Sequence, residues 1–250
     1  MAASRHSRKR RTPSADVDSS ATRLSRNSDL PAILLDLDGT LIDSVYQHTL
    51  AWAVALRSEK IELPLWKIHR HIGMSGTSFI RELMREVNSK RGKSAKQVER
   101  LNTKHDVEFS KMRLAELPGA QQLLDHFEKI RLRWAIATTS DKKQTKTLLE
   151  IIRIPPHVPV IHGDDVKNAK PSPDVFVEAS ERLAVPIDDC IVIGDSVWDV
   201  LAAGRKNALG VGLLTGGYSQ EELERAGAFR VYADPADLLI HIEDLGIPGE

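Results

Sequence analysis

Short aliphatic runs alternate with helical patterns through most of the chain, and this alternation constrains the fold more than any other feature. The first run, PAILLDLD at 31–38, has the continuous apolar character of a strand buried on both faces. Further strands are predicted at 133–139, 158–163, 190–195, 208–214 and 229–233. Helical patterns follow at 119–130, 142–152, 173–184, 197–205 and 219–226. Strand–helix alternation predicts an α/β fold with a doubly wound parallel sheet.

A helical segment interrupts this alternation directly after the first strand. Residues 44 to about 114 contain apolar residues at helical spacing in 46–57, in 78–87 and in the long stretch 94–114, and no convincing strand. Pro118 and Gly119 then mark the return to strands and helices. We therefore expect a core built from residues 31–43 and 118–250, with residues 44–117 inserted as a helical unit over one end of the sheet.

The first thirty residues differ in composition from the rest. They are rich in Ser and Arg and have few large apolar side chains, so residues 1–30 are predicted to be a disordered basic tail. The run RHSRKRR is open to contact with nucleic acid or anionic lipid, and an organelle transit peptide is an alternative reading. A solvated tail without a specific role is the interpretation we favour.

Composition narrows the choice of compartment and partner. Lys plus Arg and Asp plus Glu number 35 each, so the whole chain has no net field that would attract nucleic acid or an anionic membrane. No apolar run is long enough to cross a bilayer, and no secretory signal is present. The single cysteine, Cys190, cannot form an intrachain disulfide, which fits a reducing compartment. A cytoplasmic location is expected, with neither nucleic acid nor membrane as partner.

Paired carboxylates follow two of the predicted strands. Asp36 and Asp38 are two residues apart and face the same way if the strand continues through them, and Gly39 permits a tight turn directly after them. Asp195 and Asp199 follow the strand 190–195, where the simpler reading is that they cap a helix and complement its dipole. Ligands of open parallel sheets bind beyond the carboxyl ends of the strands, and ionised carboxylates gathered there would repel one another. We therefore expect a hard cation such as Mg²⁺ among them.

Hydroxyl groups and a lysine follow two other strands. Thr138, Thr139 and Ser140 end the strand 133–139, where hydroxyls and free backbone N–H groups would form a phosphate cradle. Lys170 precedes a Pro-rich helix start and would place a positive charge near the acids, with Lys167 as its nearby competitor. Each feature alone is ordinary, since Thr and Ser are common in strands and helix caps and most lysines are solvated.

Taken together, these four strand ends resemble the haloacid dehalogenase (HAD) superfamily of hydrolases. The family motifs DxDGT, hhhT/S, K and GDxxxD occur in the same order, as DLDGT, AIATT, KPSPD and GDSVWD. The resemblance covers residues 31 to roughly 240 and implies a Rossmann-like core. The insertion resembles the C1 cap of the phosphoglycolate phosphatase and β-phosphoglucomutase branch, in subfamily IA.

The resemblance implies a role for each motif residue. Asp36 would be the nucleophile that forms an aspartyl-phosphate, and Asp38 the general acid and base. Mg²⁺ would bind Asp36, the backbone carbonyl of Asp38 and Asp195, while Asp199 would hold a metal-bound water or orient the lysine. The phosphoryl oxygens would be held by three residues: Thr138, Thr139 and Lys170. The implied substrate is a small phosphomonoester, such as phosphoglycolate or a sugar phosphate.

The cap offers further candidates. The loop HIGMSG at 71–76 resembles the branch's substrate-reading loop, which makes Gly73, Ser75 and Gly76 candidate substrate contacts. His48 and Trp52 lie four residues apart on one helical face, and a packed pair without a ligand role is an equal alternative for them. Asp43–Ser44 and Leu117–Pro118 would be the hinges. Residues that could read an anionic group are His69, Arg70, His71 and Arg81, in no order of preference.

Several other activities compete with a phosphatase. A dehalogenase would lack the second acid and the metal, and a phosphonate-cleaving relative would need a Schiff-base lysine in a motif that does not surround Lys60 or Lys67. A β-phosphoglucomutase would carry an arginine near Gly76 to hold a second phosphate, and that arginine is missing there. A non-catalytic binding protein on the same fold would have lost at least one motif group. We therefore expect a phosphatase. Oligomeric state cannot be read from the sequence.

Overall fold

The computed structural model describes residues 30–86 and 94–249. The predicted tail at 1–30 lies outside these residues except for Leu30. Within the described part, no helix combines the length and the apolar character needed to cross a membrane.

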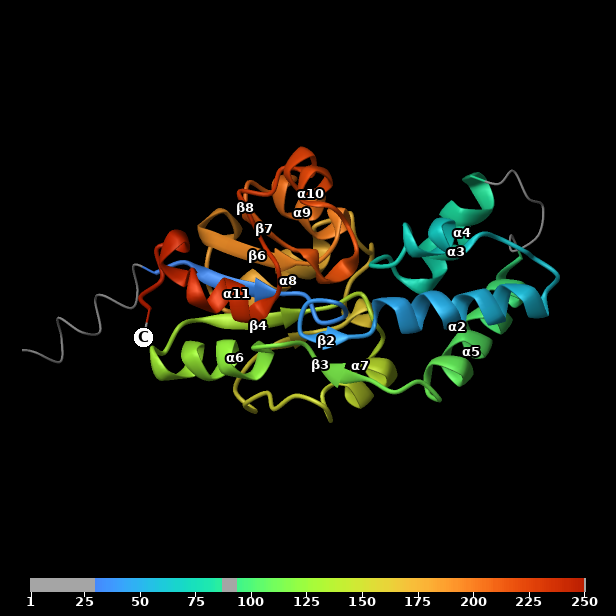
Figure 1. Ribbon diagram of the computed structural model, residues 1–250, viewed down its shortest axis with the longest axis horizontal. Helices are drawn as coiled ribbons and strands as arrows, with labels where there is room; N and C mark the ends of the chain where they lie inside the picture. Colours follow the sequence, from blue (N-terminus) through green and yellow to red (C-terminus); the bar gives the residue numbers. More distant parts are fainter. Residues whose placement is uncertain (1–29, 87–93, 250) are drawn as a thin grey trace, which may run out of the picture. The chain divides into compact units, whose positions relative to one another are not determined.

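Six parallel strands form the central sheet, as predicted (Figure 1). They are β1 (Ala32–Leu35), β4 (Trp134–Ala137), β5 (Val160–Ile161), β6 (Cys190–Gly194), β7 (Leu209–Leu213) and β8 (Arg230–Tyr232), in the order β5-β4-β1-β6-β7-β8. β1 lies in the centre, with Leu35 opposite Ile136 on one side and Ile193 on the other. Its four residues are fully buried, which is why this strand reads as an unbroken aliphatic run.

Helices cover both faces of the sheet. The core helices are α6 (Ala120–Lys129), α7 (Lys142–Leu148), α8 (Asp174–Arg182), α9 (Val197–Gly204), α10 (Gln220–Ala226) and α11 (Pro235–Ile240). Alternate strand residues such as Leu34 and Ala135 pack against Phe176 of α8. The intervening Trp134 contacts Phe127 of α6 from the opposite face, because successive strand side chains point to opposite sides.

Three predicted boundaries are wrong. The strand run 31–38 ends at Leu35, so Asp36 and Asp38 lie in the loop that follows β1. α7 ends at Leu148 rather than at 152, where two β-branched isoleucines precede Arg153 and the Pro155–Pro156 pair disfavours helix. β5 contains only two residues of the predicted 158–163, because it is an edge strand and Pro159 has no N–H to donate.

Residues 44–117, the segment that we call the cap, contain four helices. They are α2 (Val45–Ser58), α3 (Leu65–His69), α4 (Gly76–Glu86) and α5 (Ala95–Phe109). Trp52, Phe79 and Leu101 belong to a separate hydrophobic cluster that these helices share (Figure 1). Before and after the cap helices, β2 (Ile42–Asp43) and β3 (Ala115–Glu116) pair as a short antiparallel ladder. We propose this ladder as the boundary between cap and core.

The sequence also contains a helix that its own signals could have revealed. α11 begins after Asp234, whose side chain accepts a hydrogen bond from Asp237 N–H, and Pro235 occupies its first turn. An Asp followed by Pro is a standard helix start. α11 packs against α6, and both termini of that contact depend on Gly119.

Gly119 provides a test of this packing. Its φ is +75°, and a Cβ there would lie 2.4 Å from Ala236 Cα of α11. We expect Gly119→Ala to lower the free energy of unfolding by about 1–3 kcal/mol, measured by urea denaturation. The matched control is Gly204→Ala at the end of α9, where a Cβ meets nothing within 4 Å. The control should be neutral or stabilising by up to about 1 kcal/mol. Equal stability of the two variants would contradict this packing.

Candidate active site

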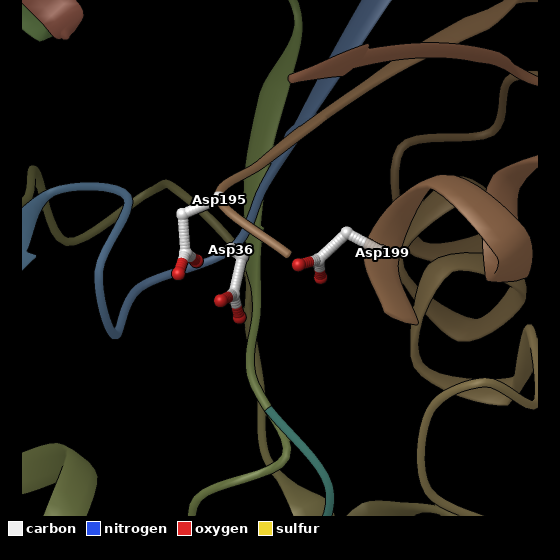
Figure 2. Close-up of side chains that lie close together, drawn as sticks. All are labelled: Asp36, Asp195 and Asp199. Atoms are coloured by element: carbon white, nitrogen blue, oxygen red, sulfur yellow. The ribbon is translucent and has the colours of Figure 1, made fainter. Parts of the chain in front are cut away.

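Three buried carboxylates meet beyond the carboxyl ends of β1 and β6 (Figure 2). Asp36 follows β1, and its N–H donates to Ile193 O at 2.9 Å, so the neighbouring strand fixes its position. Asp195 follows β6, and Asp199 lies in the first turn of α9. One oxygen from each carboxylate lies within 4.8 Å of the others. This is the convergence that the sequence predicted for these three residues.

Lys170 is the cation at this cluster. Its Nζ lies 2.5 Å from Asp36 Oδ1 and 2.8 Å from Asp199 Oδ1, and the residue is only 1% exposed. The ring of Phe176 lies 5.0 Å from the ammonium. The surrounding carboxylates raise the pKa of Lys170 against the effect of burial, so it stays charged. Lys170, and not Lys167, is thus the lysine that reaches the acids.

One ammonium does not balance the whole cluster. Burial, helped by Asp199 and Asp38, raises the pKa of Asp36 to about 7 in spite of Lys170. Burial and the neighbouring Asp199 and Asp36 also raise the pKa of Asp195 well above its ordinary value. Carboxylates in such surroundings favour a second positive charge, and an all-oxygen donor set suits a hard divalent cation. The residues present therefore fit a Mg²⁺ ion.

The helix-capping alternative holds for one acid and not for the other. The N-cap of α9 is Ser196, whose N–H and Oγ both donate to Asp199 Oδ2, at 3.2 and 2.5 Å. Asp199 therefore caps the helix with one oxygen and meets Lys170 with the other. Asp195 is not the cap. It accepts a hydrogen bond from Thr40 at 3.2 Å and is closely approached by Gly39 and Gly216.

The carboxylate of Asp38 is held apart from the three-carboxylate cluster. Ser44 Oγ and His48 Nε2 lie 2.7 and 3.0 Å from its Oδ1, and Ser140 Oγ donates to its Oδ2 at 2.7 Å. Burial alone would raise the pKa of Asp38, but His48 and the two hydroxyls outweigh it and lower the pKa to about 2. Any metal contact by Asp38 is therefore left to its backbone carbonyl.

Asp38 is the first member of a chain of hydrogen bonds that crosses the cap. His48 Nδ1 lies 3.0 Å from His105 Nε2, and His105 Nδ1 lies 3.1 Å from Asp106 Oδ1. Gln144 of α7 donates to the same Asp106 oxygen at 2.6 Å. The chain therefore runs from the core through α2 and α5 of the cap and back to the core.

Counting protons in this chain places one extra proton in it. Three hydrogen bonds join Asp38, His48, His105 and Asp106, and each needs one proton. Ionised carboxylates only accept, and a neutral imidazole supplies a single N–H, so two neutral histidines supply two protons. Burial lowers the pKa of His105 to about 4, which leaves it neutral. The third proton is therefore shared by His48 and Asp38.

The predicted phosphate cradle lies at the end of β4. Thr138 Oγ1 accepts a hydrogen bond from Ser140 N–H at 3.0 Å, and the residue is buried. The hydroxyl of Thr139 donates to Gly73 O of the cap at 3.0 Å. This hydroxyl is thereby engaged in a contact between cap and core, so phosphate binding by Thr139 is left to its backbone.

A cavity of about 340 Å³ opens above these groups and separates core from cap residues. Gly73, Ser75, Gly76 and His48, all predicted as substrate contacts, line it. The sequence reasoning missed four further lining residues: Asn102, His105, Asp106 and Gln144. The first three, with Phe109, are spaced i, i+3, i+4 and i+7 on α5, so a polar and aromatic stripe on one helix face was the available signal.

The four cationic cap candidates do not line this cavity. His69 Nε2 lies 2.8 Å from Gly216 O, and Arg70 pairs with Glu222 of α10. His71 Nδ1 bonds to Lys67 O at 2.8 Å. Arg81 is exposed on α4. Three of the four therefore serve contacts within the cap or with the core.

The buried His105 gives the folded state a pH dependence. Its pKa of about 4 lies below the unfolded value near 6.5, so its contribution to stability is complete above about pH 6.5 and is lost as the pH falls toward 4. We expect the wild type to lose about 2 kcal/mol more than His105→Gln between about pH 7 and pH 5, measured by chemical denaturation. The control is His157→Gln at an exposed site, which should follow the wild type. A pH dependence unchanged in His105→Gln would contradict the neutral, buried histidine.

Comparison with known proteins agrees with this geometry. The family model described as haloacid dehalogenase-like hydrolase matches residues 30–205. Hexitol phosphatase A of Escherichia coli K12 is 29% identical over 173 residues, which are 68% of this chain and 76% of that protein. Phosphoglycolate phosphatase of the same strain is 26% identical over 247 residues, 90% of this chain and 96% of the relative.

A solved structure extends the similarity to the fold. The crystal structure of a hydrolase from Pseudomonas syringae has a TM-score of 0.82 and 45% sequence identity, and the match covers 86% of this chain and 98% of that one. The matched family model spans most of the chain and includes the strand ends that carry all four motifs. The chain therefore belongs to the haloacid dehalogenase-like hydrolases, an enzyme family in which its relatives include phosphatases.

Proposed function

We propose that the protein is a Mg²⁺-dependent phosphatase that hydrolyses a small phosphomonoester through an aspartyl-phosphate on Asp36. The observation that carries this proposal is the buried cluster of Asp36, Asp195 and Asp199 around Lys170, at the floor of a cavity lined by Asp36 and Asp38. A reducing, cytoplasmic location is part of the proposal and is supported by the single, buried cysteine, Cys190.

Asp36, Asp195 and the backbone carbonyl of Asp38 would hold the metal, with Asp199 beside them. Bound there, Mg²⁺ would neutralise charge on the nucleophile and on the phosphoryl group. Lys170 supplies the permanent positive charge from the other side of Asp36. Thr138 and the backbone N–H groups that follow it would hold the remaining phosphoryl oxygens.

In the first step a carboxylate oxygen of Asp36 attacks phosphorus, and the bond from phosphorus to the ester oxygen breaks. The departing alkoxide takes the proton that Asp38 and His48 share, so the alcohol leaves neutral. In the second step water attacks the phosphorus of the aspartyl-phosphate, and its proton returns to Asp38. Phosphate leaves, and Asp36 is again a carboxylate.

Contacts in the cavity favour hydrolysis over a mutase reaction. A mutase must hold a second phosphate, and the described lining contains neither Arg nor Lys to do so. Asp38, with its shared proton, together with the acid cluster, also argues against dehalogenation. A binding protein without activity would need none of this complete set.

The first prediction concerns the nucleophile and the metal. Phosphate release from a panel of phosphomonoesters should require Mg²⁺ and stop with EDTA, and Asp36→Asn should lower kcat by at least about 1,000-fold, because no nucleophile remains. Mg²⁺ should raise the Tm of the wild type but not of Asp195→Asn, since binding to the folded state alone stabilises it. The control is Asp125→Asn at an exposed site on α6. Metal-independent turnover, or full activity in Asp36→Asn, would overturn the proposal.

A second prediction isolates Asp38. Asp38→Asn keeps an acceptor for Ser44 but loses the shared proton, so kcat for an alkyl phosphate should fall by about 100- to 10,000-fold. The loss for a nitrophenyl phosphate should be much smaller, because that leaving group departs without protonation. An equal loss on both esters would show that Asp38 acts on structure or binding and not as the acid.

A further inference from the structure

We propose that the alcohol part of the substrate is uncharged and hydroxylated, as in a sugar or polyol monophosphate, and carries neither a carboxylate nor a second phosphate. This inference rests on the proposed phosphatase activity and assigns its substrate class. It is carried by the charges and hydrogen-bonding groups that line the 340 Å³ cavity beyond the phosphoryl site.

The part of the cavity away from Asp36 carries negative charge only. Asp106, Asp141 and Asp164 line it, and the described lining includes no Lys or Arg. The nearby Lys143 of α7 acts on the Asp106 carboxylate from an exposed position and does not line the cavity. An anionic leaving group would face these carboxylates, and juxtaposed like charges are costly where water is excluded.

The cap's cations are occupied elsewhere or lie out of reach. Arg70 pairs with Glu222, and Lys67 pairs with Glu86 at 2.9 Å. Both contacts hold the cation away from the cavity lining. α4 enters the cavity at Gly76 and runs on to Glu86, about 15 Å along the helix axis at 1.5 Å per residue. The outer end of that helix is therefore remote from the substrate.

The same surface offers partners for hydroxyl groups. The amide of Asn102 lines the cavity with no hydrogen-bond partner among the residues that the structure describes, and it packs against Gly76, where a Cβ would lie 2.4 Å from Asn102 Oδ1. Gln144 donates to Asp106 and keeps its carbonyl oxygen as an acceptor. Amide and carboxylate groups pair with hydroxyls, which both donate and accept.

Aromatic rings complete the surface. Trp52 and Phe79 line the cavity and stack with ring centroids 4.4 Å apart, and Trp52 also stacks with His105 at 4.2 Å. These faces offer dispersion contact to the C–H groups of a polyol or sugar. A site of this kind, apolar with a few placed polar groups, matches an uncharged hydroxylated ligand.

The test uses esters matched in size and different in charge. With Mg²⁺ and saturating enzyme stability controls, kcat/KM is measured for 2-hydroxyethyl phosphate, phosphoglycolate and phosphoethanolamine. A second pair compares fructose 6-phosphate with fructose 1,6-bisphosphate, and a hexitol phosphate and a nitrophenyl phosphate are added. We expect each uncharged ester to exceed its anionic counterpart by at least about tenfold, the effect of one unfavourable like-charge contact.

Two variants link the preference to the cavity. Asp141→Asn removes a charge but keeps the N-cap of α7, since Asn accepts from Gln144 N–H as Asp141 does at 2.8 Å. It should move the ratio toward phosphoglycolate by about three- to tenfold. Thr77→Arg adds a cation to the lining and should move the ratio the same way. The control is Glu221→Gln on the outer face of α10, paired with Arg225, which should leave the ratio unchanged.

The outcomes separate this inference from the function on which it rests. Turnover in which phosphoglycolate or the bisphosphate equals its uncharged counterpart would overturn the substrate class and leave the phosphatase standing. A preference for phosphoethanolamine would do the same in favour of a cationic substrate, as would turnover of the nitrophenyl ester alone. Failure to hydrolyse any ester would overturn the proposed function, and the substrate class with it.

Discussion

The contact of the Lys170 ammonium with Asp36 and Asp199 is the interaction on which the rest of the site depends. Buried carboxylates are costly unless they are compensated, and here two of them share one buried cation at 2.5 and 2.8 Å. The contact joins the loop after β1 to α9 and to the segment before α8. It also leaves Asp195 without a full counter-charge, which creates the demand for a second cation. The same shortage of positive charge that makes the cluster expensive is what would draw Mg²⁺ and a phosphoryl group to it.

A second network connects this chemistry to the cap. Asp38 is three residues beyond the end of β1, yet its carboxylate is held by His48 of α2 and by Ser140 after β4. Through His105 and Asp106 the network returns to Gln144 of the core. Thr139 and Gly73 add a further contact between the two parts. The acid that would protonate the leaving group is thus positioned by the same contacts that hold the cap helices against the core.

How far the sequence predicted this arrangement depended on the range of the interaction. The sheet, the convergence of Asp36, Asp195 and Asp199, and the choice of Lys170 over Lys167 followed from local patterns, because strands and their end residues are written in consecutive letters. The choice between Ser196 and Asp195 as the N-cap needed backbone geometry. The chain from His48 through His105 to Asp106 joins residues 57 positions apart, and no local pattern specifies that pairing. The fate of Arg70, which binds Glu222 and not a ligand, is likewise a long-range choice.

The most direct test of the account is to trap the phosphorylated enzyme. A phosphomonoester that turns over is mixed with the enzyme and Mg²⁺, the reaction is quenched in acid within one turnover, and the peptides are mapped by mass spectrometry. The account predicts one phosphoryl group on the peptide that contains Asp36, with none in Asp36→Asn. Phosphate release without any phosphorylated peptide, together with inversion of configuration at a chiral phosphorus, would mean direct attack by water and would contradict it.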